Sequence, residues 1–154
     1  MPTFNIEPAE RLLDDVGLNI LFELQENARI SFSELGRRVG LTAPAVAERV
    51  RRMEEAGIIT GYHAHVDPEK LGLPITAYLH VDTTDQSCRS LTHLLQEVPE
   101  VLECHRITGD DDLLIKVSVS SVSHLQALLD RIVEFGTIST SLVLSSAVRR
   151  RSIR

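Results

Sequence analysis

Apolar residues between positions 13 and 56 recur with the three- and four-residue spacing of amphipathic helices. The pattern predicts three helices, over about 14–25, 31–39 and 42–56. Asp14, Ser31 and Thr42 stand at their starts, where short polar side chains accept hydrogen bonds from the first free N–H groups of a helix. The apolar stripes expected to be buried are Leu13, Val16, Ile20, Leu21 and Leu24 in the first helix, and Val46, Val50 and Met53 in the third.

Only residues 40–42 separate the second predicted helix from the third. Ser31 and Glu34 have the spacing of a capping box, and Gly40 stands where a helix commonly ends in the left-handed conformation. Two helices on so short a turn must cross steeply, which is the geometry of a helix-turn-helix that places its second helix in a DNA major groove. Gly17, inside the first helix, is expected to cost about 1 kcal/mol relative to Ala.

After Gly57 the apolar pattern changes to the alternation of β-strands. Residues 58–66 are expected to be extended, which makes the first domain a winged helix-turn-helix, and 67–74 is rich in Pro, Gly and charge. Strands over 75–81, 101–107, 113–119 and 138–146 alternate with helical spacing over 91–98 and 125–133. The predicted fold class is therefore α+β, with a ferredoxin-like βαββαβ domain after the helix-turn-helix.

These elements divide the chain into four parts: a DNA-binding domain over 1–61, a strand and linker over 62–73, a second domain over 74–148, and a basic tail over 149–154. In the second domain both helices are expected on one face of the sheet. The other face then needs a cover, with Leu79, Ile115 or Leu144 as candidates to line it. A second copy of the sheet is the simplest cover, so we expect a homodimer.

The distribution of charge supports DNA binding although the net charge is −6. Between positions 37 and 52 there are five arginines and one acid, Glu48. Glu48 could accept a hydrogen bond from cytosine or pair with Arg52 four residues later. Arg37 and Arg38 are expected at phosphates or in solvent rather than at bases. The predicted DNA contacts are Arg37, Arg38, Thr42, Ala43, Ala45, Glu48, Arg49 and Arg52. The partner is double-stranded DNA.

Other functions find little support in the 154 residues. The chain has no apolar run of membrane-spanning length and no signal-peptide pattern, so we expect a cytoplasmic protein without membrane contact. Its two cysteines form neither a disulfide framework nor a metal-ligand pattern. His63 and His65 supply only two ligands on one side of a strand, which does not make a metal site. We expect no catalytic residue, metal or cofactor.

Taken together, the motifs resemble the Lrp/AsnC family of transcription regulators, over about residues 13–148. The segments that carry the resemblance are Leu13-Asp14, Ile20-Leu21, Asn27-Ala-Arg-Ile-Ser31, Glu34-Leu35, Val39-Gly-Leu-Thr42, Arg49-Val-Arg-Arg-Met-Glu54, Gly57-Ile-Ile-Thr-Gly-Tyr62, Leu71-Gly72, Cys104-His-Arg-Ile-Thr-Gly-Asp110 and Thr140-Ser-Leu-Val-Leu144. The chain departs from the family at Gly17, where an acidic residue is common, at Asp111, where an aromatic residue is usual, and over 134–137, where Pro-Gly-Val is common.

The resemblance implies a regulator whose second domain senses a small effector, frequently an amino acid, and forms dimers that can assemble into octamers. It places the turn 108–112 near the effector pocket, where Gly109 permits close backbone approach and a carboxylate can hold an amino group. The residues implied in effector binding are Thr108, Gly109, Asp110, Asp112, Thr140 and Ser141.

The sequence leaves two alternative functions open. Sirohaem decarboxylases resemble the same two-domain fold, and the chain has six histidines, but the arginine-rich third helix favours DNA over a tetrapyrrole. A nucleoid-organising protein of low sequence specificity would differ from a specific regulator only in its ratio of specific to non-specific affinity.

Overall fold

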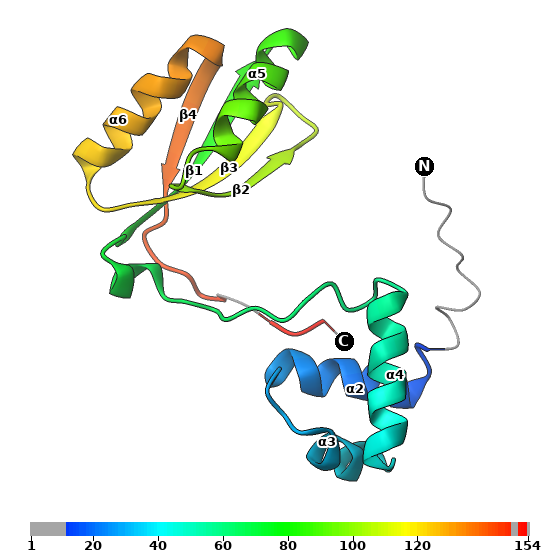
Figure 1. The fold of residues 1–154 in the computed structure, drawn as a ribbon. Helices are drawn as coiled ribbons and strands as arrows, with labels where there is room; N and C mark the ends of the chain where they lie inside the picture. The colour runs from blue at the N-terminus through cyan, green and yellow to red at the C-terminus, as the bar shows by residue number, and fades with distance from the viewer. Residues whose placement is uncertain (1–11, 149–150, 154) are drawn as a thin grey trace. The chain divides into compact units, whose positions relative to one another are not determined.

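The computed structural model describes residues 12–148 and 151–153 (Figure 1). They fall into two compact units. The first ends at Ala64 and includes the C-terminal residues from Val148, and the second is His65–Ala147. Arg149, Arg150 and Arg154 of the basic tail lie outside the described residues.

The first unit contains three helices, α2 (Asp15–Glu26), α3 (Phe32–Val39) and α4 (Ala43–Glu55). The three predicted caps are confirmed. Asp14 accepts a hydrogen bond from the N–H of Gly17, Ser31 from that of Glu34, and Thr42 from that of Ala45. The side chains that fill the core between the helices are Leu12, Ile20, Leu24, Leu35, Val46, Val50 and Met53.

Two positions in this unit require glycine because backbone atoms of another segment approach them closely. A Cβ on Gly36 would lie 2.4 Å from the carbonyl oxygen of Leu41, so the turn between α3 and α4 closes only over a residue without a side chain. A Cβ on Gly17 would lie 1.8 Å from the carbonyl oxygen of Leu12. The expectation that Ala at position 17 would make the protein more stable than Gly is therefore wrong. Helix propensity takes no account of this contact with a residue outside the helix. Gly40 has a φ of 73°, the left-handed conformation predicted for it.

The wing of the first unit has no strand pairing. Residues 58 and 59 form a bend and 60–67 have no regular secondary structure, so no strand forms over the expected range 58–66. A short 3-10 helix, η1 (Pro68–Leu71), follows in the second unit. Its start is fixed by Asp67, whose side chain accepts a hydrogen bond from the N–H of Glu69.

The second unit has the predicted βαββαβ order. Its elements are β1 (Ile75–Thr83), α5 (Asp85–Gln96), β2 (Val101–Arg106), β3 (Leu113–Val119), α6 (Val122–Ile132), the 3-10 helix η2 (Val133–Phe135) and β4 (Gly136–Leu142). The strands pair antiparallel in the order β2-β3-β1-β4. Helices α5 and α6 cover one face of this sheet, and β4 ends at Leu142 rather than at the predicted 146 (Figure 1).

The prediction of which side chains lie on the uncovered sheet face is wrong. Leu79 and Ile115 are partners in the β1–β3 ladder, and both are fully buried in the core beneath the helices. Leu144 lies beyond β4 and is 95% exposed. Because side chains alternate along a strand, the other face carries the neighbouring residues. We call this the open sheet face, and it includes Tyr78, His80, Leu114 and Lys116.

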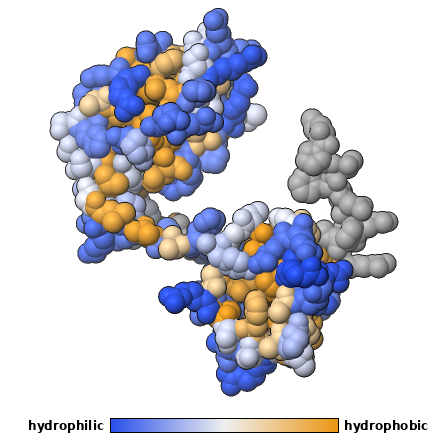
Figure 2. Space-filling view, viewed as in Figure 1, coloured by the Kyte–Doolittle hydropathy of each residue, from blue (hydrophilic) through white to orange (hydrophobic). Residues whose placement is uncertain are grey.

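The open sheet face is more polar than the predicted one, which explains the error. Alternation gives two equivalent sets of residues in each strand, and the more aliphatic set faces the helices, where the most apolar area is removed from water. Polar residues also cover most of the visible surface of this unit, broken by apolar patches (Figure 2).

Candidate functional site

The surface of α4 that faces away from the core carries a run of charged side chains. Val46, Val50 and Met53 point into the core, and positions three and four residues apart share a helix face. The opposite side, which we call the outer face of α4, consists of the exposed residues Pro44, Glu48, Arg51, Arg52 and Glu55. A helix packed by one side on a rigid core and open on the other can enter a DNA groove.

The predicted DNA contacts do not all lie on this face. Glu48 and Arg52 do, and Thr42 is exposed at the start of the helix, whereas Ala43 and Ala45 are half-buried beside it. Arg51 lies on the outer face and was not predicted as a contact. Its three-residue distance from Glu48 was the signal that could have identified it.

Arg49 lies against α2 instead of facing outward. Its guanidinium donates two hydrogen bonds to the carboxylate of Asp14, with N–O distances of 2.6 and 2.7 Å. The same carboxylate accepts the N–H of Gly17 and so caps α2. The hydrogen bonds from Arg49, with that of Gly17, lower the pKa of Asp14 to about 2. Arg49 therefore ties α4 to the start of α2, which its position in the sequence alone could not indicate.

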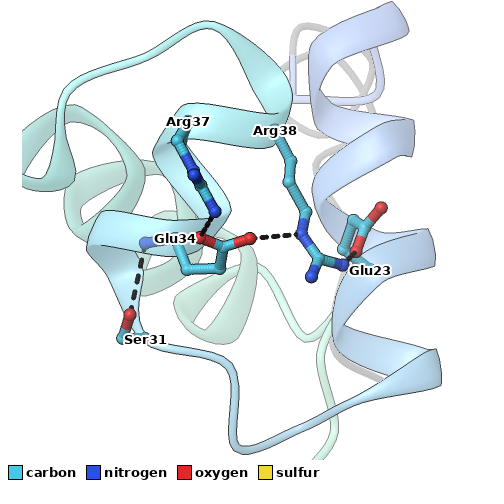
Figure 3. A network of polar contacts seen from close by, with 5 residues as sticks. All are labelled: Glu23, Ser31, Glu34, Arg37 and Arg38. Atoms are coloured by element: carbon cyan, nitrogen blue, oxygen red, sulfur yellow. Dashed lines mark hydrogen bonds and ion pairs between the residues drawn. The ribbon is translucent and has the colours of Figure 1, made fainter.

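The other arginines near the turn are also paired with acids of the same unit. Arg38 donates to Glu34 at 2.9 Å and to Glu23 at 2.6 Å, and Arg37 contacts Glu34 as well (Figure 3). These hydrogen bonds, that of Arg38 first, lower the pKa of Glu34. Glu34 thus binds arginines through its carboxylate, while its N–H completes the cap at Ser31.

On α4 Glu48 accepts hydrogen bonds from Arg51, with N–O distances of 2.7 and 3.0 Å. Arg52, the partner that the sequence suggested, attracts Glu48 without a hydrogen bond. Arg51 also reaches Glu55, and its hydrogen bond lowers the pKa of Glu48. Within 12–148 and 151–153, Arg52 and Arg29 form no ion pair with a carboxylate. Most of the positive charge of the helix-turn-helix is therefore compensated internally.

The predicted effector residues of the 108–112 turn have different surroundings. Asp112 is structural: its N–H donates to the carbonyl of Val81, and its carboxylate accepts the N–H of Thr83 at 2.9 Å. Thr108, Gly109 and Asp110 are exposed. Gly109 has a φ of 123° and open space around it, so its backbone is accessible to another molecule.

The two predicted residues of β4 face opposite sides of the sheet. Ser141 pairs with Tyr78 and lies on the open sheet face, and Thr140 pairs with Leu79. Thr140 lines a shallow hollow of about 170 Å³ between α6 and β4. Its β1 partner is four residues from Thr83, about 13 Å along the strand. One subunit therefore does not bring Thr140 and Ser141 to the turn.

No group of three metal-ligating side chains occurs among the residues that the structure describes. Cys104 faces the core side of β2, opposite Ile115, and His105 faces the other side, as the strand alternation predicts. Across the described part of the chain, no helix is both long and apolar enough to cross a membrane.

Comparison with known proteins matches both units. Residues 13–60 match the model of a winged helix-turn-helix DNA-binding domain, and residues 76–153 match the Lrp/AsnC ligand binding domain. The chain is 41% identical over 135 residues to YezC, an uncharacterized HTH-type transcriptional regulator of Bacillus subtilis, covering 88% of this chain and 96% of that protein. It is 40% identical over 121 residues to the proline dehydrogenase transcriptional activator of Rhodobacter capsulatus, covering 77% and 79%.

A solved structure agrees over nearly the whole chain. The L-Met complex of a transcriptional regulator from Neisseria meningitidis superposes with a TM-score of 0.87 at 28% identity, covering 92% of this chain and 96% of that one. The relatives are regulators rather than decarboxylases. The chain is a DNA-binding transcriptional regulator and belongs to the Lrp/AsnC family.

Proposed function

We propose that the protein binds specific double-stranded DNA sequences through the outer face of α4. The observation that carries this proposal is the exposed run on that face, which includes Arg51 and Arg52. The helix is joined to α3 by a tight turn in which the backbone of Leu41 approaches Gly36 closely. Among the described residues Arg52 forms no close ion pair and is attracted to Glu48 only from a longer distance, which leaves its guanidinium available for a guanine edge or a phosphate. Thr42, Ala43 and Ala45, at the start of the helix, would approach the bases.

The paired arginines take a second role in this proposal. Arg37, Arg38 and Arg51 would exchange exposed carboxylates for phosphates when DNA binds, which costs little because exposed ion pairs contribute about 0–1 kcal/mol. Arg49, which the sequence suggested as a base contact, instead positions α4 through Asp14.

Binding to an operator identified by genome-wide mapping of bound sites tests the proposal. If Arg52 contacts a base edge, we expect Arg52→Ala to weaken operator binding by about 1–3 kcal/mol. Arg37→Ala is expected to weaken binding to all DNA sequences alike. Arg89→Ala, at an exposed position of α5, is the matched control. Unchanged affinity in a folded Arg51→Ala/Arg52→Ala protein would exclude the outer face of α4.

We also propose a homodimer formed through the open sheet face, with an octamer as the next assembly to test. Tyr78 and Leu114 offer half-buried apolar area on that face without a cover from their own unit. A dimer presents two helix-turn-helix units to two half-sites, which raises the affinity through effective concentration. A monomer in light scattering of the full chain, at concentrations that bind DNA, would contradict this.

We further propose that a small effector, most simply an amino acid, changes DNA affinity by preferring one assembly. The L-Met complex of the Neisseria meningitidis regulator supports this class of ligand. Two places on the second unit could bind the effector. The exposed Asp110 and the open backbone at Gly109 support the 108–112 turn. Thr140 supports the hollow beside α6, which is also lined by Asp130.

Calorimetry against the twenty amino acids separates the two places. If the turn binds the amino group, Asp110→Asn abolishes the heat of binding and Asp130→Asn does not, and the reverse holds for the hollow. Equal binding by native protein and both variants would exclude both carboxylates.

A further inference from the structure

The two edges of the sheet in the second unit differ in how they are protected against pairing. In the strand order β2-β3-β1-β4, the edge strands are β2 and β4. β2 has a bulge between Val101 and Glu103 and carries charged side chains such as Glu103 and Arg106. Bulges and charges keep an edge strand from pairing with another chain. β4 pairs regularly with β1 and has no charged residue, so its outer side, which we call the β4 edge, lacks both protections.

Every second residue of β4 directs its backbone groups away from β1. The N–H of Val143, just after the strand, donates to the carbonyl of Thr76 on β1 at 2.9 Å. In an antiparallel ladder the hydrogen-bonded pairs then follow at every second position from this one. The residues between them direct their N–H and C=O groups outward, where the described residues form no further strand. These outward residues of the β4 edge are Ile138, Thr140 and Leu142.

The side chains of these three residues lie on the helix side of the sheet, because their β1 partners belong to the core. Two of them line the shallow hollow between α6 and β4. Leu142 is 50% exposed, and Val133, which also lines the hollow, is 59% exposed. The single charged side chain of this lining, Asp130, accepts a hydrogen bond from Gln126 at 2.7 Å. The β4 edge therefore offers apolar area beside its outward backbone groups.

The β4 edge is complementary to a second copy of itself. Antiparallel pairing about a two-fold axis at Thr140 would set Thr140 opposite its own copy and Ile138 opposite the copy of Leu142. Each outward N–H and C=O group would then have a partner, because hydrogen-bonded residues of an antiparallel pair exchange both bonds. Threonine pairs and apolar pairs are both favourable across strands. The chain has a net charge of −6, but an uncharged strand brings no like charges together when it meets its copy.

We propose that the β4 edge is a second self-association surface, on which β4 of another copy adds antiparallel about Thr140 to form one continuous sheet. This surface is distinct from the open sheet face, because it lies along one strand rather than across all four. The paired run is short, so the area that it buries suits the joining of dimers better than the formation of a dimer. The inference thus extends the proposed homodimer to a larger assembly, which presents more helix-turn-helix units to one DNA.

Charges placed at the two-fold axis test the proposal in the full chain. In Thr140→Lys or Thr140→Glu the same charge would meet itself across the strand pair, which is destabilising. We expect each variant alone to lose the species larger than a dimer in sedimentation velocity, and an equimolar mixture of the two to recover it. Ser90→Lys and Ser90→Glu, at an exposed position of α5, are the matched controls and should sediment like the native protein. Native melting temperatures establish that each variant is folded.

The outcomes separate this surface from the open sheet face. Larger species that the two Thr140 variants lose, and that their mixture regains, support the β4 edge. Unchanged assembly in both variants overturns the proposal and leaves a dimer through the open sheet face intact. Loss in both variants without recovery in the mixture overturns the pairing of β4 with its copy. A native protein that stops at the dimer also overturns the proposal, and a native monomer contradicts both interfaces.

Exchange of single amide hydrogens, followed by NMR, gives a readout that a contact elsewhere on the protein would not produce. The N–H groups of Ile138, Thr140 and Leu142 should exchange more slowly as the protein concentration rises and the larger species forms. That of Ser141, which is directed toward β1, should be slow throughout. The amides of β2 are the control and should show no dependence on concentration. Fast exchange of the three outward amides in the larger species would overturn the proposal.

Discussion

Replacing Gly36 by Ala should destabilise the DNA-binding unit although Ala is the better helix former. The new Cβ would lie 2.4 Å from the carbonyl oxygen of Leu41, and contacts under 3.0 Å are essentially never found for real Cβ atoms. The neighbour is backbone and cannot rotate away, so the turn between α3 and α4 must open. The N–H of Leu41, which donates to the carbonyl of Gly36 at 2.8 Å, would then lose its partner.

The expected size of the effect follows from three contributions. Overpacking with a backbone shift costs about 1–3 kcal/mol, and the lost hydrogen bond about 1 kcal/mol. The helix propensity of Ala returns about 1 kcal/mol. The net loss is therefore about 1–3 kcal/mol, and in a unit of this size each kcal/mol lowers the melting temperature by about 4–8 °C.

Thermal unfolding of the full chain by circular dichroism measures this loss, and anisotropy with the operator measures its consequence for DNA binding. Ser33→Ala, at an exposed position of the same helix, changes propensity without a clash and should stay within about 0.5 kcal/mol of the native protein. Below the melting temperature, Gly36→Ala should also bind the operator more weakly, because the crossing of α3 and α4 has changed. Equal melting temperatures in Gly36→Ala and Ser33→Ala would refute the reasoning.

Three further changes test other contacts. Gly17→Ala should lower the melting temperature, because its Cβ would meet the carbonyl of Leu12 at 1.8 Å; a rise would show that propensity dominates. Asp14 has its pKa lowered from 3.8 to about 2, chiefly by Arg49, so its ionised form stabilises the fold above pH 4 and this contribution is lost as the pH falls toward 2. The stability advantage over Asp14→Asn should therefore shrink across that interval in acid titrations; a constant difference contradicts the pairing. Asp112→Ala should destabilise the second unit more than Asp112→Asn, which keeps an acceptor for the β1 amide; equal melting temperatures would oppose this.

The sequence predicted local features well because they depend on few neighbouring residues. A helix cap such as Ser31 needs only its own side chain and an N–H three residues later, and Gly40 needs only a left-handed φ. The order of strands and helices follows likewise from alternation and period. The sheet phase was missed because alternation does not say which set of side chains faces the helices, as Leu79 and Ile115 show.

Contacts between residues far apart in the chain were beyond such reasoning. Position 17 requires glycine because the carbonyl of Leu12 lies where a side chain would start. Helix propensity scales contain no information on this contact. Arg49 and Asp14 are 35 residues apart, and only the packing of α4 beside α2 brings them together. The split of Thr140 and Ser141 between two faces follows from the strand register, which places adjacent residues on opposite sides.

The ion pairs also reduce the positive charge that the arginine-rich segment 37–52 presents to DNA. Five arginines between positions 37 and 52 suggested a strongly cationic surface, yet four of them neutralise acids of the same unit in the folded protein. A phosphate that binds one of these arginines must displace the carboxylate, which costs little because exposed ion pairs contribute about 0–1 kcal/mol. Within the described residues, Arg52 on the outer face of α4 forms no such ion pair. A comparison of Arg52→Ala with Arg37→Ala therefore separates an arginine that binds DNA directly from one that must first leave a carboxylate.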